Sequence, residues 1–95
     1  MEIQEAYKLK LAAQLNEWGA QIDLLEAKME NLGADIKIQR AVEMRALRAK
    51  QHAASEKMRE LGQASGAAWE QVKITADKIW DELKAGVAEV QAKFK

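Results

Sequence analysis

Residues 11–36 read LAAQLNEWGAQIDLLEAKMENLGADI, and the large apolar side chains in this stretch recur at alternating steps of four and three residues. The positions that share this spacing, called the heptad seam below, are Leu11, Leu15, Trp18, Ile22, Leu25, Met29, Leu32 and Ile36. A repeat of 3.5 residues keeps one face of a helix turned towards a partner helix, which is the requirement for a left-handed coiled coil. The stretch therefore predicts a helix that buries this seam, and we expect the seam to be the principal contact between chains.

The composition of the whole chain is typical of helices. The 95 residues contain no proline and no cysteine, and 32% of them are charged. Fifteen basic and fifteen acidic residues cancel, so no net field draws the chain to nucleic acid or to an anionic membrane. A chain of this length forms one domain with a thin core, and association with other chains is a common way to bury more surface. The absence of cysteine excludes disulfides and thiolate metal sites.

A second pattern occupies the last third of the chain. The pentapeptide WEQVK at 69–73 returns as WDELK at 80–84, and Phe94 follows Leu83 by eleven residues. An eleven-residue repeat keeps an apolar stripe almost straight along a helix. The positions of this C-terminal stripe are Trp69, Val72, Ala76, Ile79, Trp80, Leu83, Val87, Val90 and Phe94.

Glycines mark the expected breaks. Gly33 follows Leu32 of the heptad seam, and Gly62 follows Leu61 in the similar segment KMRELG, as a left-handed glycine does at the C-terminal end of a helix. The segment GQASG at 62–66 is the stronger turn signal, with Ser65 as a turn or N-cap residue.

Two architectures fit these breaks. Helices at 2–32, 34–61 and 66–94 would form an all-α, antiparallel three-helix bundle of coiled-coil type, in one domain spanning 1–95. Alternatively, a continuous helix of about 60 residues and a shorter one would form a hairpin that oligomerises. Folding back at Gly33 would bring the acidic first arm onto a basic middle arm, with Glu30 near Lys37 and Glu17 near Lys50.

The residues that could carry chemistry are few. His52 is the only histidine and has Glu56 as its best acidic neighbour, whereas a metal site needs three or four ligands. Ser55 and Ser65 have no nucleophile-elbow context. We therefore expect no catalytic residue, no metal, no cofactor and no small-molecule substrate. The four arginines, which could contact phosphates, all lie in the middle segment, but acidic residues are interleaved with them, so nucleic-acid binding is disfavoured. They are Arg40, Arg45, Arg48 and Arg59.

The C-terminal stripe resembles the eleven-residue helical repeats of exchangeable apolipoproteins and of late-embryogenesis-abundant proteins over residues 69–95. Trp18 on a first helix and Trp80 on a last one resemble the tryptophan placement of spectrin-type three-helix repeats. In style the whole chain is similar to small coiled-coil proteins of bacterial genomes. None of these resemblances implies a catalytic residue.

The sequence thus predicts a structural or interaction protein that acts through helix faces and associates with itself or with a helical partner. The expected contact residues are the heptad seam together with Trp69, Val72, Trp80, Leu83 and Phe94. Reversible binding of residues 66–94 to a lipid surface is the first alternative, and nucleic-acid binding through the arginine segment is the second. The start of the chain lacks the apolar region of a secretory signal and no stretch has the length of a membrane span, so we expect a cytoplasmic protein.

Overall fold

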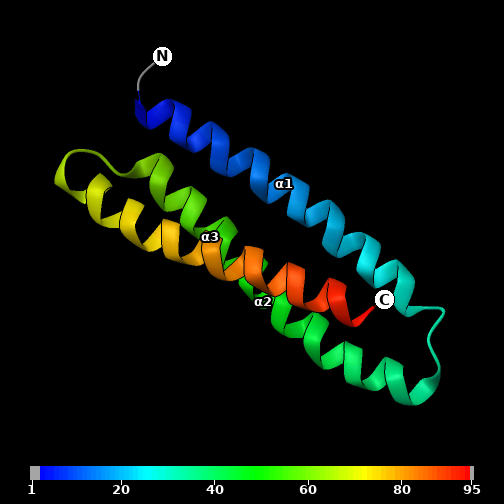
Figure 1. Ribbon diagram of the computed structural model, residues 1–95. Helices are drawn as coiled ribbons and strands as arrows, with labels where there is room; N and C mark the ends of the chain where they lie inside the picture. The colour runs from blue at the N-terminus through cyan, green and yellow to red at the C-terminus, as the bar shows by residue number, and fades with distance from the viewer. Residues whose placement is uncertain (1–2, 95) are drawn as a thin grey trace.

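Three helices make up the structure, a computed structural model that describes residues 3–94. They are α1 (Ile3–Met29), α2 (Ala34–Gln63) and α3 (Ala67–Lys93). Figure 1 shows that α2 runs antiparallel to α1 and that α3 turns back alongside both, so the two termini lie at opposite ends. The bundle is 51 Å long and 20 by 17 Å across. The prediction of a three-helix bundle is confirmed, and the alternative of one continuous first helix is wrong.

The first helix ends three residues earlier than the sequence predicted. The amides of residues 30, 31 and 32 donate to the carbonyls three residues before them, at N···O distances of 3.3, 3.2 and 3.1 Å. Such short-range bonds satisfy the last carbonyls of a helix while the chain leaves the helical path. Leu32 therefore lies in the connection, and Ile36 lies in the first turn of α2. The heptad seam is divided between two helices.

Both breaks lie where the sequence predicted them, but the conformations of the glycines differ from the predicted ones. Gly33 precedes α2 in an extended conformation (φ −63°, ψ 157°), so the expected left-handed glycine is wrong at this position. Gly62 is helical, because α2 continues to Gln63. Gly66 precedes α3 at φ 59° and ψ −135°, a conformation that side chains with a Cβ avoid. Ser65 lies in this connection, as predicted for a turn residue, and Gly66 holds the N-cap position.

The core lies where the apolar faces of the three helices meet. The largest side chains that are fully buried come from all three helices, and they are Ile22, Leu47, Leu61 and Leu83. Among residues 3–94 no polar or charged residue is buried. The α2–α3 contact is the most extensive of the three and the α1–α3 contact the least. As a result α1 lies over the α2–α3 pair with one whole side turned outwards.

We expect the two connections to respond differently to the same substitution. Gly66→Ala should lower the free energy of unfolding by about 1–3 kcal/mol, because alanine is strained at this φ and ψ. Gly33→Ala meets no atom within 4 Å of the added Cβ and should leave stability unchanged or raise it by about 0.4–1 kcal/mol, since alanine restricts the unfolded chain. Urea unfolding followed by tryptophan fluorescence measures both changes. Equal losses would contradict the assigned backbone conformations.

Candidate interaction surfaces

The heptad seam faces inwards. Leu11, Ile22 and Leu25 are buried between α2 and α3, and Leu15, Trp18, Met29 and Leu32 are half-buried. Ile36 is 48% exposed. The face that the sequence offered as the principal contact between chains is thus largely covered by the chain's own helices, so a second copy could reach it only if the bundle opened.

The C-terminal stripe is also packed inside the bundle. Trp69, Trp80 and Leu83 are buried, and Val72 and Phe94 are half-buried. The Trp80 indole donates its Nε1–H to the carbonyl oxygen of Leu11 at 3.2 Å. Both indoles therefore contribute to the packing of α3 against its neighbours.

Tyr7 joins the first turns of α1 to α3, a contact that the sequence did not predict. Its ring meets Trp69 edge to face, with centroids 5.6 Å apart, and the Lys73 ammonium lies 5.1 Å from the ring centroid. Its hydroxyl donates a hydrogen bond to the carboxylate of Asp77. Burial raises the pKa of the Tyr7 phenol, and the hydrogen bond and the negative charge of Asp77 raise it further. These partners lie 62 to 70 positions from Tyr7, so no local signal marks them.

Ion pairs join α1 to α2. Arg48 donates to Asp23 at 2.8 Å and to Glu26 at 2.6 Å. The hydrogen bond from Arg48 lowers the pKa of Glu26, and the two carboxylates raise the pKa of Arg48. Lys37 lies 3.5 Å from Glu30, as predicted. The predicted approach of Glu17 to Lys50 is not among the ion pairs of residues 3–94. Arg48 makes the acidic-to-basic contact instead, with Asp23 and Glu26, which lie six and nine residues further along α1.

One carboxylate links α2 to α3. Glu43 lies 2.9 Å from the Lys93 ammonium and also pairs with Arg40 on its own helix. The hydrogen bond from Lys93 lowers the pKa of Glu43, against an opposing effect of burial, and the charge of Arg40 lowers it further. Together with the Glu56 pairing of Arg59, these contacts neutralise three of the four arginines.

Three hollows among residues 3–94 are lined without a histidine or a serine. The one between α1 and α3, about 400 Å³, is lined by Trp18, Lys10, Asp77, Lys84 and neighbouring residues. His52 is exposed elsewhere, 4.0 Å from Glu56. Among residues 3–94, histidines and carboxylates nowhere gather in the threes or more that could hold a metal ion. None of the helices described has the length and apolar character that crossing a bilayer requires.

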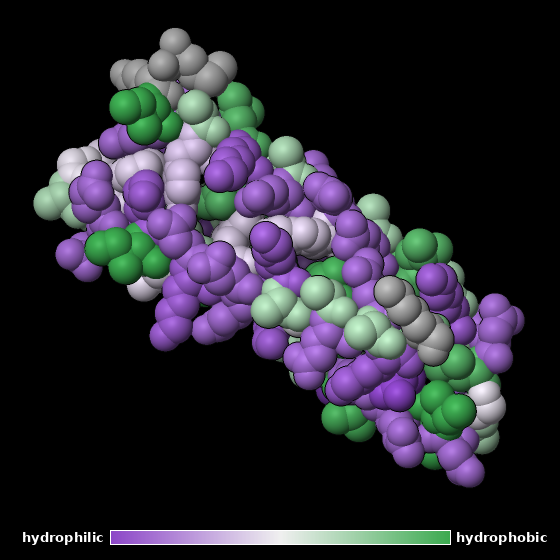
Figure 2. All heavy atoms as spheres, in the orientation of Figure 1, coloured by the Kyte–Doolittle hydropathy of each residue, from purple (hydrophilic) through white to green (hydrophobic). Residues whose placement is uncertain are grey.

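The surface that sequence reasoning missed is the outward side of α1. Seven residues spaced three or four apart along this side, called the outer stripe below, are all exposed. They are Ala6, Leu9, Ala13, Asn16, Ala20, Leu24 and Ala27. Leu9 is 55% and Leu24 57% exposed. On the first half of α2, Ile38 and Val42 are also exposed, by 68% and 61%. Figure 2 shows hydrophobic side chains spaced along the edge of the molecule that α1 forms.

No protein-family model, no curated protein and no solved structure matches the chain.

Acid should weaken the α2–α3 contact through Glu43. Because its pKa is lowered in the folded state, this carboxylate contributes stability above the unfolded pKa of about 4.3, and the contribution is lost as the pH falls below that value. Glu43→Gln should cost about 1 kcal/mol at pH 7 and make the loss of stability between about pH 5 and pH 3 smaller. Glu82→Gln is the control, because Glu82 is exposed and makes no ion pair within residues 3–94. Equal acid sensitivity of the two variants in urea titrations would argue against this role.

Proposed function

We propose that the chain is a non-enzymatic structural or interaction protein of the cytoplasm that acts through its helix faces and associates with itself. The observation that carries this proposal is the outward side of α1, where Leu9 and Leu24 are exposed among alanines. A surface helix of a globular domain normally has one apolar side and one polar side. On α1 the second apolar side has no helix of its own chain to pack against, so it can accept another helix.

The size of the chain supports the same proposal. A core shared by three helices of 27, 30 and 27 residues is thin, and small domains commonly gain stability from association. Exposed leucine, isoleucine and valine on α1 and α2 offer apolar surface for such a contact. In a chain with equal numbers of acidic and basic residues, burial of this surface meets no net repulsion between copies.

The two alternative functions have less support. Lipid binding through α3 would have to pull Trp69 and Trp80 out of the bundle, at the cost of the Trp80 hydrogen bond to Leu11. Nucleic-acid binding through α2 would have to compete with the carboxylates that already pair with Arg40, Arg48 and Arg59.

Sedimentation equilibrium tests the proposal directly. Between about 5 µM and about 500 µM, the weight-average mass should rise from the 10.7 kDa of one chain towards a multiple of it. The dependence should remain at moderate salt, since the proposed contact is mainly apolar. A mass that stays at 10.7 kDa over the whole range would overturn self-association.

A further inference from the structure

We infer that a second copy of this chain docks on the outer stripe of α1, with the two α1 helices parallel and in register. This inference rests on the proposed self-association and specifies its surface and its geometry. The occupant follows from two properties of α1, the small side chains of its outer stripe and the charges that flank the stripe.

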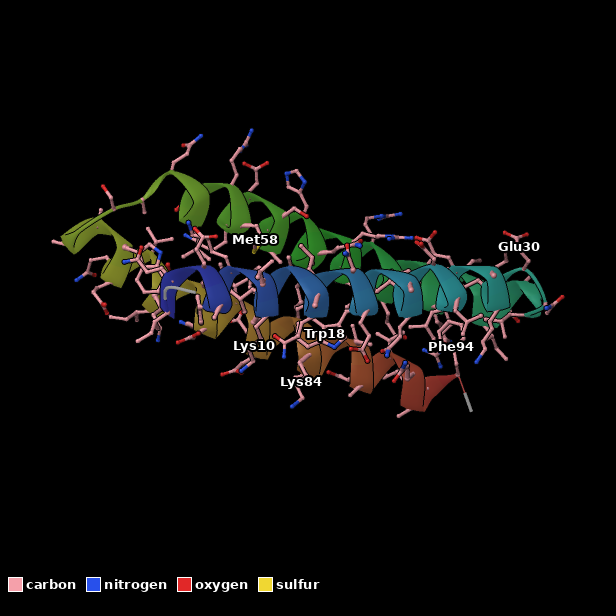
Figure 3. The ribbon with its side chains drawn as sticks, turned by 90° about the horizontal axis from the view of Figure 1, so that it is seen from above. Lys10, Trp18, Glu30, Met58, Lys84 and Phe94 are labelled. Carbon is pink, nitrogen blue, oxygen red and sulfur yellow. The ribbon has the colours of Figure 1, made fainter. Side chains whose placement is uncertain are left out.

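The outer stripe has the form of a helix-pairing seam. Its alanines at 6, 13, 20 and 27 are spaced by seven residues, and Leu9 and Leu24 lie between them. Small residues at every second turn allow two helix backbones to approach closely, and the leucines fill the remaining space between them. Figure 3 looks onto this side of α1, which neither α2 nor α3 covers.

The two flanks of the stripe differ in charge. Glu5 and Asp23 are 18 residues apart, which is five helical turns, so they share one flank, and Asp23 bonds Arg48 of α2. Lys10 and Lys28 are also 18 residues apart and share the other flank, towards α3, where the exposed Glu17 lies between them. Figure 3 shows Lys10 on that side, where it lines the hollow between α1 and α3.

A parallel pair brings the unlike flanks together. Two parallel helices related by a twofold axis along their length place the left flank of one against the right flank of the other. Glu5 then meets Lys10, five positions further along the second copy, and Glu17 faces the uncharged Ala12. This is the spacing at which charged flanks of parallel coiled coils pair. Lys10 makes no ion pair in its own chain within residues 3–94, whereas Glu5 lies 3.6 Å from the Lys8 ammonium.

An antiparallel pair would bring like flanks together. The acidic flank, which continues at Glu30, would lie against its own copy, and Glu17 would come close to the second copy's Glu17. Like charges across an interface oppose association. Asn16 favours the in-register arrangement. In the parallel pair its side-chain amide lies beside the same amide of the second copy, and a polar residue inside an apolar seam finds a hydrogen-bond partner there only when the two helices are in register.

Substitution in the stripe tests the surface. Ala13→Glu should abolish the dimer, because it inserts a charge at the centre of the seam. Ala88→Glu is the matched control, since Ala88 is equally an exposed helical alanine but lies on α3. Circular dichroism should show both variants folded. If Ala13→Glu leaves the dimer unchanged, self-association uses another surface, such as Ile38 and Val42 of α2, and the stripe is free for a different helical protein. That result would overturn this inference while the proposed function stands.

A charge exchange tests the pairing of the flanks. Lys10→Glu should raise the dimer dissociation constant on the order of tenfold, because two attractive pairs become repulsive. The double variant Glu5→Lys with Lys10→Glu should restore the affinity of the unmodified chain. Loss without restoration would overturn the pairing.

Cysteine cross-linking tests the direction, and the chain has no natural cysteine to interfere. If the helices are parallel and in register, Ala6→Cys alone and Ala27→Cys alone should each oxidise to a covalent dimer, because equivalent positions face each other within the reach of a disulfide. Ala88→Cys should stay largely uncross-linked. Cross-linking only when the Ala6→Cys and Ala27→Cys chains are mixed would show an antiparallel pair and overturn the inferred geometry. A chain that is monomeric at every concentration would overturn the proposed self-association, and this inference with it.

Discussion

Burial of the inward face of α1 between α2 and α3 is the interaction on which the structure depends. Ile22 is fully buried at this junction, and Leu11 and Leu25 are buried above and below it. The bond from the Trp80 indole to the Leu11 carbonyl and the contact of Tyr7 with Trp69 fix how far α3 lies along α1. Without α1, the α2–α3 hairpin would expose two tryptophans, and a two-helix unit would have no enclosed core.

The sequence predicted the fold well where periodicity alone determines the outcome. The 3.5-residue spacing identified the inward face of α1 because burial and spacing have the same cause, one side of a helix facing its neighbours. It misplaced the end of α1 because the spacing continues through Leu32 and Ile36 while the backbone turns. The spacing of apolar residues depends only on their positions in the sequence. It does not show whether the backbone hydrogen bonds across those positions are helical.

The interaction surface was less predictable, for two physical reasons. A pattern of apolar residues shows which face is buried but not whether the same chain or another one covers it, and here α2 and α3 cover the heptad seam. The outer stripe consists mostly of alanines. Alanine favours a helix wherever it occurs, so its presence in the sequence does not indicate a contact surface. The pairing of Tyr7 with Asp77 spans 70 positions and has no sequence signal that precedes the fold.

The two sides of α1 differ in side-chain size, and this difference separates folding from the association that we propose. The inward side carries isoleucine, leucine and tryptophan, which bury large areas and hold the three helices together within one chain. The outward side carries mainly alanine, which buries little area per residue, so a contact made there would be weaker and reversible. Because such a seam has little shape to distinguish one partner or direction from another, the charges on its flanks and the single asparagine would have to supply the specificity. An assembly of this kind would respond to protein concentration without unfolding the chains that form it.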